Sequence, residues 1–266
     1  MTLYCNPGYC NPAWQSVLES SQFATFDQIW NHPIDWIDTP NQNRGGWSGV
    51  GCVKIVKDGR SVTLFVKKQQ NHVSRTWRHP LKGEPTFLRE FQVLQYFKAQ
   101  ELAAPDVVFF AQRIVAEGQQ AILITQMLEG YQPLDTLIQT QGKSMPQPSK
   151  RILISCVADA VKRMHGLGVQ HRALYPKHIF VRPVGASFDV AFIDLEKSRQ
   201  MILSPLQSVN DLITFNYRTT GWNLPHRLYF LERYFSITRL NGLYKMLWRW
   251  IAYKTRQKQH QWNSEK

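Results

Sequence analysis

The chain has 266 residues, of which 43% are hydrophobic and 19% are charged. This composition supports a sizeable buried core and excludes a wholly disordered protein. Its 32 basic and 19 acidic residues give a net charge of +13, which marks either a soluble basic protein or one with a polyanionic neighbour. Such neighbours are phosphate ligands, nucleic acid and anionic membrane surfaces.

The four cysteines, Cys5, Cys10, Cys52 and Cys156, do not form a pattern of zinc ligands. A Cys5–Cys10 disulfide stays open, although a reducing compartment fits better. The first residues lack a basic segment followed by an apolar run, so no secretory signal is expected. No stretch reaches about 18 uninterrupted apolar residues, and we therefore expect a cytoplasmic protein.

Residues 1–35 are rich in Trp, Asn and Pro and are expected to form an irregular N-terminal extension. Runs of β-branched and aromatic residues follow in "GGWSGVGCVKIV", "GRSVTLFVKKQ" and "VVFFAQRIVAEGQQAILITQML". They predict strands of an antiparallel sheet, with "KDGR" as the hairpin turn between the first two. Residues 36–130 are therefore predicted to form a sheet-rich N-lobe.

The glycine-rich stretch "GGWSGVG" lies between these strand-like segments. Glycines let backbone amides approach phosphates closely, although such stretches are also ordinary turns. The candidates for nucleotide contact here are Gly46, Ser48, Gly49 and Gly51.

One helix interrupts the predicted strands, in "EPTFLREFQVLQYFKAQEL", where Phe87, Phe91 and Leu94 form an apolar stripe. Glu90 is either a boundary residue or an acid that points toward the sheet and requires a cationic partner. Lys67 in "TLFVKKQ" is a candidate for that partner and for holding nucleotide phosphates. Its neighbour Lys68 points the other way, and the sequence does not decide between the two lysines.

Residues 131–266 are predicted to form a mainly helical C-lobe. "SKRILISCVADAVKRMHGLG" predicts a helix with Ser149 as its N-cap and Gly166 and Gly168 at its end. Its apolar face is predicted to contain Leu153, Val157, Ala160 and Met164.

A hairpin is predicted in "HIFVRPVGASFDVAFIDLE", with Pro183 and Gly185 in its turn. Asp194 emerges at the end of its second, apolar strand. A carboxylate there suits a Mg²⁺ ion that bridges phosphates, or it is simply a capping aspartate.

The stretch "GVQHRALYPKHIFVR" is similar to the H-R-D-L-x-x-x-N catalytic loop of kinases, except that Ala173 stands where the aspartate belongs. Together with "LFVKKQ", "REFQVLQYF" and "FIDLEKSR", it resembles the lipopolysaccharide kinase family (InaA/WaaP type). That family is a branch of the protein-kinase-like fold. The resemblance covers roughly residues 40–215 and implies a bilobal α+β protein.

The resemblance implies that Lys67 binds the phosphates of ATP and pairs with Glu90, and that Asp194 binds Mg²⁺. His178 stands where protein kinases place an asparagine and would support the metal or the phosphate. His171 belongs to the same set of catalytic-loop residues. Asp211 and Leu212 resemble the later acidic anchor that braces the catalytic loop.

The implied activity is ATP-dependent transfer of a phosphoryl group to a sugar hydroxyl of a glycolipid, the lipopolysaccharide core. Only 17 residues separate Asp194 from Asp211, which leaves little room for a peptide-gripping segment and favours a sugar acceptor. Ala173 also leaves open a pseudokinase with a nucleotide-binding or regulatory role. The candidates to replace the missing base are His171, Tyr175 and Glu196.

The C-terminal segment, residues 216–266, carries ten Lys or Arg and two Glu, with Trp222, Trp248, Trp250, Tyr253 and Trp262 among them. In "LYKMLWRWIAYKTRQK" one helical face contains Leu243, Met246, Leu247, Trp250 and Ile251. This helix suits either an anionic membrane interface at the inner face of a bacterial inner membrane, or packing on the C-lobe. No nucleic-acid-binding motif accompanies the charge, so no nucleic acid partner is expected.

Overall fold

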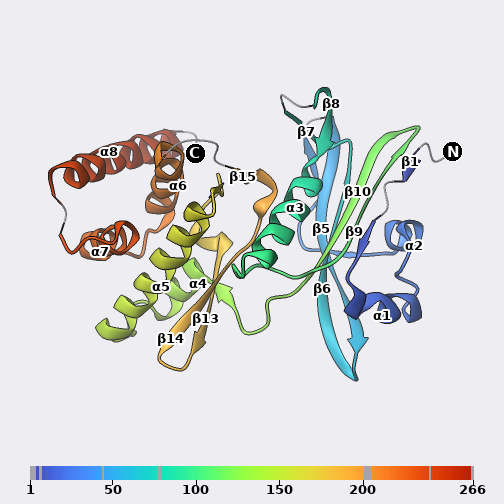
Figure 1. Ribbon diagram of the computed structural model, residues 1–266, viewed down its shortest axis with the longest axis horizontal. Helices are drawn as coiled ribbons and strands as arrows, with labels where there is room; N and C mark the ends of the chain where they lie inside the picture. Colours follow the sequence, from blue (N-terminus) through green and yellow to red (C-terminus); the bar gives the residue numbers. More distant parts are fainter. Residues whose placement is uncertain are drawn as a thin grey trace. The chain divides into compact units, whose positions relative to one another are not determined.

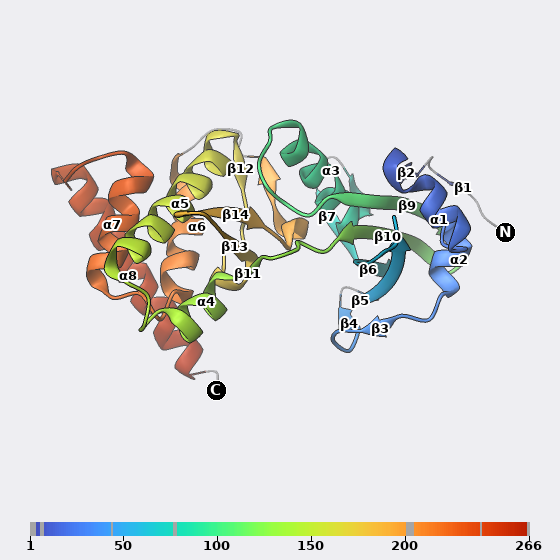
Figure 2. The ribbon, with the colours of Figure 1, turned by 90° about the horizontal axis from the view of Figure 1, so that it is seen from below.

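The structure, a computed structural model, describes residues 4–5, 8–43, 45–76, 79–200, 205–239 and 241–264. The chain divides into two compact units (Figures 1 and 2). The first comprises Met1–Gln100 and Ala104–Glu129, and the second comprises Glu101–Ala103 and Gly130–Lys266. An antiparallel sheet in the first unit and a mainly helical second unit confirm the predicted α+β class.

The first unit is built on an antiparallel sheet in the order β1-β9-β10-β6-β5-β3, with β2 also paired to β9 and β4 to β5. Its strands are β1 (Tyr4–Cys5), β2 (Tyr9–Cys10), β3 (Asp35–Trp36), β4 (Asn41–Asn43), β5 (Gly46–Lys57), β6 (Arg60–Gln70), β9 (Val107–Val115) and β10 (Gly118–Gln126). The predicted strands are all present. The predicted hairpin turn is also confirmed, with Asp58 and Gly59 at φ values of 51° and 73°.

Helix α3 (Thr86–Ala99) follows a separate hairpin of β7 (Val73–Thr76) and β8 (His79–Pro85) and packs on β9 and β10. Its buried side chains include Phe87, Glu90, Leu94 and Phe97. Phe91 is half-buried and stacks on Phe110 with ring centroids 4.4 Å apart. The predicted apolar stripe is therefore present, and it carries Glu90 into the interior.

The N-terminal extension is regular rather than irregular, which corrects the expectation from its composition. It forms a 3-10 turn (Pro12–Trp14) and the helices α1 (Gln15–Ser20) and α2 (Phe26–Asn31). A capping box of Thr25 and Gln28 starts α2. Figure 1 shows the sheet between these helices and α3. The extension and the sheet share one apolar core, which includes Trp14, Leu18, Phe23, Ile29, Leu64, Val66, Ile122 and Ile124.

Glycines in β5 let the end of the extension lie directly on the sheet. A Cβ atom on Gly49 would lie 2.6 Å from a ring carbon of Trp36, and one on Gly51 would lie 2.1 Å from Cγ2 of Ile34. Because real Cβ atoms do not approach so closely, a side chain at either position would displace the extension. These glycines therefore have a packing role in the fold.

Lys68 fastens the extension to the sheet. Its Nζ donates hydrogen bonds of 2.9 Å each to the carbonyl oxygens of Trp30 and His32, and the residue is only 4% exposed. The register pairs Lys68 with Gly49, so the two occupy the face of the sheet that the extension covers. Lys68 thus satisfies two carbonyl groups at the C-terminal end of α2, those of Trp30 and the C-cap His32.

Within its described residues, the second unit combines five α-helices with short strands. The helices are α4 (Leu134–Gln141), α5 (Gln147–Gly166), α6 (Pro205–Arg218), α7 (Leu224–Phe235) and α8 (Gly242–Ser264). A three-stranded sheet contains β11 (Gln132–Pro133), β13 (Ile179–Val184) and β14 (Ser187–Phe192), and β12 (Val169–Gln170) pairs with β15 (Arg199–Gln200). Helix α5 packs on α7 and β14, and α8 packs on α6.

Details of α5 differ from the prediction. The helix begins at Gln147 after Pro146, so Ser149 lies inside the first turn and is not the N-cap. Ala160 is only half-buried. Because α5 packs on both α7 and β14, the buried stripe is wider than predicted and also includes Ile154, Ala158 and Val161.

The hairpin of β13 and β14 is confirmed, with Gly185 in its turn at a φ of 56°. Pro183 lies in β13 opposite Phe188 rather than in the turn. Because β11 pairs only with Phe180 and Val181, the other edge of β13 is open at Pro183, where a proline is tolerated.

Cys10, Cys52 and Cys156 are free thiols, so Cys10 does not form a disulfide with Cys5. The side chains of Cys5 and Trp262 lie outside the described residues. Across the described ranges, no helix combines the length and apolar character that crossing a bilayer requires.

The burial of Lys68 predicts a specific dependence of stability on pH. Burial lowers its pKa from 10.5 to about 8, so between these values the unfolded chain binds a proton that the folded chain has lost. Stability should therefore rise with pH across this window, by at most about 3 kcal/mol. Urea denaturation should show this rise in the wild type and not in Lys68→Met.

Lys54→Met is the matched control, because Lys54 is an exposed lysine on the adjacent strand β5. This variant should keep the slope of the wild type. Parallel stability curves for wild type and Lys68→Met would contradict the account of the buried ammonium group.

Candidate functional site

Lys67 and Glu90 form an ion pair across the sheet–helix interface of the first unit. Lys67 Nζ lies 2.6 Å from Glu90 Oε1, and the two side chains are 16% and 4% exposed. Successive residues of a strand point to opposite faces, so Lys67 faces α3 while Lys68 faces the extension. The structure thereby assigns the charge pair to Lys67 and the anchoring of the extension to Lys68.

The same alternation divides the glycine-rich stretch. Most of it lies in β5, and only Gly45 stands in the turn before it, at a φ of 78°. Val50 pairs with Lys67, so Ser48 shares the Lys67 face, whereas Gly49 and Gly51 are on the extension face.

Gly46 is required by the neighbouring strand, because a Cβ atom there would lie 2.0 Å from the carbonyl oxygen of Gln70. Of the four candidates for nucleotide contact, Ser48 is therefore the one whose side chain shares a face with the ion pair.

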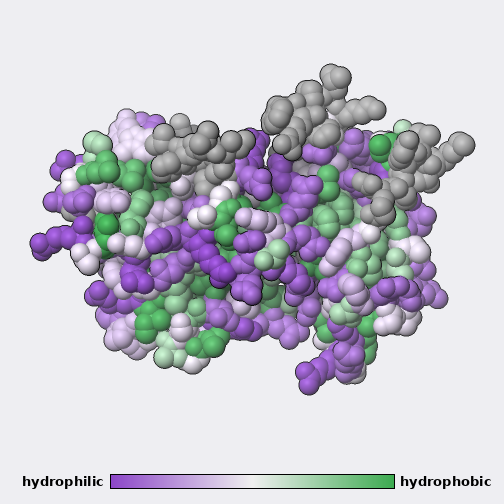
Figure 3. Space-filling model, in the orientation of Figure 1, coloured by the Kyte–Doolittle hydropathy of each residue, from purple (hydrophilic) through white to green (hydrophobic). Residues whose placement is uncertain are grey.

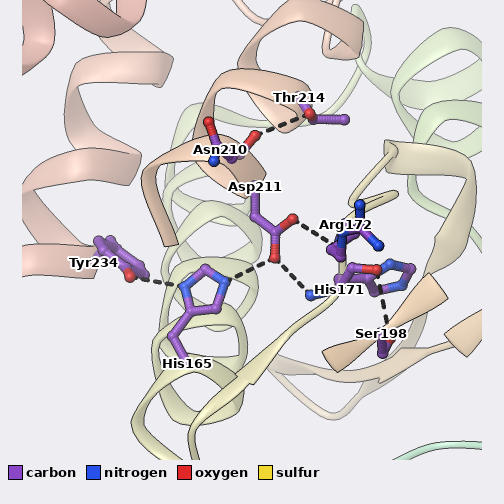
Figure 4. Close-up of polar contacts among 8 residues, drawn as sticks. All are labelled: His165, His171, Arg172, Ser198, Asn210, Asp211, Thr214 and Tyr234. Carbon is purple, nitrogen blue, oxygen red and sulfur yellow. Dashed lines mark hydrogen bonds and ion pairs between the residues drawn. The ribbon is translucent and has the colours of Figure 1, made fainter. Parts of the chain in front are cut away.

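In the second unit, Asp211 of α6 holds the loop that contains His171 and Ala173. Its Oδ2 accepts a hydrogen bond of 2.7 Å from the backbone N–H of His171, and its Oδ1 accepts one of 2.8 Å from Arg172 (Figure 4). Asp211 is completely buried. The geometry is that of the acidic anchor expected from the sequence.

A second layer supports this carboxylate. His165 Nε2 lies 3.2 Å from Asp211 Oδ2, and His165 Nδ1 lies 2.7 Å from the hydroxyl of Tyr234 (Figure 4). Because a carboxylate only accepts, Nε2 donates to Asp211, and Nδ1 of the neutral ring is then the acceptor that faces the Tyr234 hydroxyl. Burial raises the pKa of Tyr234, which keeps that hydroxyl a donor.

His178 and Asp194 bring a nitrogen and an oxygen together beside the same loop. His178 Nδ1 donates to the carbonyl of Ala173 at 2.9 Å, and Nε2 lies 3.3 Å from Asp194 Oδ2. Burial lowers the pKa of His178, which favours the neutral ring with its lone pair on Nε2. Asp194 adopts a left-handed conformation, with φ at 59°, an uncommon backbone geometry for a residue with a side chain.

The family model described as "Lipopolysaccharide kinase (Kdo/WaaP) family" matches residues 27–234, which is most of the chain. The chain belongs to the lipopolysaccharide kinase family. One relative is "Protein InaA" from Escherichia coli (strain K12). It is 31% identical to this chain over a region that covers 69% of this chain and 82% of that protein.

A second relative is the "Lipopolysaccharide core heptose(I) kinase WaaP" of Pseudomonas aeruginosa, 28% identical over 55% of this chain and 58% of that protein. A solved structure described as "WaaP in complex with acyl carrier protein" aligns with a TM-score of 0.69. The alignment covers 95% of this lipopolysaccharide kinase family member and 99% of that chain, at 20% identity. The shared fold is therefore kinase-like.

The candidates that the sequence offered for the missing base have different surroundings in this family member. His171 is completely buried, burial lowers its pKa, and its Nε2 lies 3.0 Å from the carbonyl oxygen of Ile193. It therefore positions the loop and cannot reach an acceptor. Tyr175 is half-buried beside His178, with ring centroids 5.3 Å apart, and Glu196 is half-buried in the turn after Asp194.

Sequence reasoning missed His165 and Tyr234. His165 lies at the end of the predicted helix, in "MHGLG". The only sign of its role in the sequence is that this polar residue directly follows the apolar Met164, which is buried. Tyr234 is 69 residues further along the chain, and nothing in its local pattern marks it as a partner of this histidine.

The buried network around Asp211 predicts the effect of removing its charge. Asp211→Asn keeps one acceptor oxygen but places an NH₂ group beside a backbone N–H donor. We expect this variant to lose about 2–4 kcal/mol of unfolding free energy in urea denaturation, because buried donors lose their acceptor.

Asp159→Asn is the control, since the ion pair of Asp159 with Arg233 is 3.0 Å long and about half exposed on both sides. The control should change stability by less than about 1 kcal/mol. Equal effects of the two substitutions would contradict the bracing role of Asp211.

Proposed function

We propose that this chain is an ATP-dependent kinase that phosphorylates a sugar hydroxyl of a lipopolysaccharide-type glycolipid. The observation that carries the proposal is the Lys67–Glu90 ion pair, closed at 2.6 Å. In kinases this pair presents a lysine ammonium to the nucleotide phosphates. Membership of the lipopolysaccharide kinase family supports the choice of reaction.

A divalent cation fits the second unit. His178 Nε2 and Asp194 Oδ2 would hold it, and burial lowers the pKa of His178, which favours the neutral ring that a metal ligand requires. Within the described ranges no set of three His, Cys, Asp or Glu residues converges on a metal, so phosphate oxygens and water would complete the shell. When bound, Mg²⁺ supplies neutralisation of the charge on the transferred phosphoryl group.

The acceptor is proposed to be a glycolipid rather than a peptide. Asp211 follows Asp194 by only 17 positions, and Asp211 is fixed in the core by its hydrogen bonds to the loop. This spacing is too short for a long peptide-gripping segment. Similarity to the lipopolysaccharide core heptose(I) kinase of Pseudomonas aeruginosa supports a lipopolysaccharide-core acceptor.

Ala173 favours a second candidate function, a pseudokinase that binds nucleotide without transferring phosphate. The residue is 2% exposed, and its methyl group cannot accept a proton. A general base contributes about 10²–10⁴-fold to a rate. Its loss slows transfer but leaves the positioning of the substrates and the neutralisation of phosphate charge in place. Both candidates require nucleotide binding, and they differ in transfer.

Nucleotide binding is tested by thermal unfolding of the full chain with Mg·ATP. At about 100 times Kd, the wild type should gain about 5–10 °C in Tm. Lys67→Ala and Asp194→Ala should each lose this gain, because they remove a phosphate contact and a metal ligand. Lys54→Ala removes an exposed lysine of β5 and should keep it. No gain in the wild type would refute both candidate functions.

Transfer is tested next, with labelled ATP and purified lipopolysaccharide core as acceptor. Label in the core that depends on Lys67 and Asp194 establishes the kinase. Nucleotide binding without label in any acceptor preparation establishes the pseudokinase instead.

We further propose that α8 brings the protein to an anionic membrane. An exposed stripe on this helix consists of Leu243, Met246, Trp250 and Tyr253, whose exposures are 66%, 64%, 40% and 55%. Ile251, predicted to share the face of Trp250, is instead completely buried, about 100° around α8 from Trp250. Hydrophobic and hydrophilic residues lie side by side over α8 in Figure 3.

Basic side chains flank this stripe, among them Lys245, Arg249 and Lys254. An apolar stripe between cations suits the interface of an anionic bilayer, where each basic residue contributes about 1 kcal/mol. Docking there would place the enzyme beside a lipid-anchored acceptor.

Vesicle sedimentation tests this docking. The wild type should bind phosphatidylglycerol vesicles more strongly than phosphatidylcholine vesicles, and salt should weaken the binding. Replacing Leu243 and Met246 together with serine should lower the partition about tenfold or more, because two apolar side chains are lost. Leu224→Ser, at an exposed leucine of α7, should have little effect. Equal binding to both lipids, or no loss in the double variant, would refute the docking.

A further inference from the structure

A pocket of about 440 Å³ lies beside the loop that carries Ala173, entirely within the second unit. Three segments line it: α4 through Asp135 and Gln139, the loop through Tyr175 and Lys177, and the end of α6 with the turn after it through Arg218 and Thr220. These segments are far apart in the sequence. The pocket size is in the range of small-ligand sites in proteins.

The lining of this pocket combines two kinds of groups. Lys177 is exposed and forms no ion pair among the described residues, and Arg218 places its guanidinium over the rings of Tyr175 at 5.5 Å and Tyr217 at 4.6 Å. Ring contacts restrict the arginine, so less entropy is lost when it binds a ligand. Two cations against the single carboxylate of Asp135 give the pocket a positive balance.

The remaining groups suit hydroxyls. Asp135 and Gln139 supply oxygens that accept hydrogen bonds, and Thr220 supplies a hydroxyl that both donates and accepts. The half-buried ring of Tyr175 adds aromatic surface to the lining, beside the guanidinium of Arg218. Such a lining fits a polyhydroxylated ligand that also carries negative charge.

The pocket is connected to the proposed chemistry through Tyr175. Its ring contacts His178 with centroids 5.3 Å apart, and His178 Nε2 lies 3.3 Å from Asp194. A ligand held against Tyr175 therefore lies next to the residues proposed to hold the metal. That is the position an acceptor hydroxyl requires in phosphoryl transfer.

We infer that this pocket binds the acceptor through an anionic sugar, one that carries a phosphate or a carboxylate, with Lys177 and Arg218 as the charge-recognising residues. This inference rests on the proposed function and names the acceptor site within it. Lys177 is then a specificity-determining residue rather than a catalytic one.

Ligand-observed NMR titration of the full chain tests the inference with three probes: glucose 6-phosphate, glucose and inorganic phosphate. Glucose 6-phosphate should bind more tightly than either of the others. It is the one probe that has both a charged group for the two cations and hydroxyls for the polar side chains of the pocket. Lys177→Glu should weaken this binding about tenfold or more, since it reverses a charge that contacts the ligand.

Two variants complete the design. Lys143→Glu reverses an exposed lysine outside the pocket and should bind like the wild type. Lys67→Ala should also keep sugar-phosphate binding, which excludes binding of the probe at the nucleotide lysine. Equal affinities of wild type and Lys177→Glu, or no preference for the charged sugar, would overturn the inference.

The Mg·ATP thermal shift, measured on the same samples, separates this inference from the proposed function. An intact shift without Lys177-dependent sugar binding overturns the pocket alone. Lys177-dependent sugar binding without any shift supports the pocket and overturns the kinase.

Discussion

The carboxylate of Asp211 is the interaction on which the second unit depends. It is fully buried and accepts hydrogen bonds from two consecutive backbone amides, those of His171 and Arg172. A buried charge is stable only when its hydrogen bonds are satisfied, so the loop and α6 fix one another. Ala173 follows these two anchored residues directly. Its carbonyl oxygen accepts a hydrogen bond from His178 Nδ1, which orients Nε2 of the same ring toward Asp194. The absent aspartate at position 173 has therefore not dismantled the loop around it.

In the first unit, the alternation of strand faces separates two tasks between adjacent lysines. Lys67 points to α3 and pairs with Glu90, while Lys68 points to the extension and holds two of its carbonyl groups. Gly49 and Gly51 follow the same rule, because their bare faces receive the extension. The alternation of side chains along a strand thus determines how the N-terminal segment packs. It also determines which of the two lysines is available to a ligand.

The predictable parts of the molecule are those with strong local patterns. Strands β5, β6, β9 and β10 and helix α3 follow from their periodicity, and Glu90 pairs with Lys67 because a buried acid needs a cation. Helices α1 and α2 are six residues each, too short to show a helical period, and they are stable only on the sheet. His165 and Tyr234 are in contact although 69 residues separate their positions in the sequence. In α8, packing on α6 determines that Ile251 is buried while Trp250 is exposed. Tertiary packing decides such features, and no local pattern contains them.

We propose that the braced loop positions the site for phosphoryl transfer, and that Ala173 removes the group that would accept the proton of the acceptor hydroxyl. Measuring transfer to lipopolysaccharide core by Ala173→Asp, with Ala173→Asn as a control of equal size, tests it most directly. We expect a rise of about 10²–10⁴-fold for the aspartate variant alone, with nucleotide binding unchanged. A folded, nucleotide-binding Ala173→Asp variant that transfers no faster than the wild type would contradict the claim.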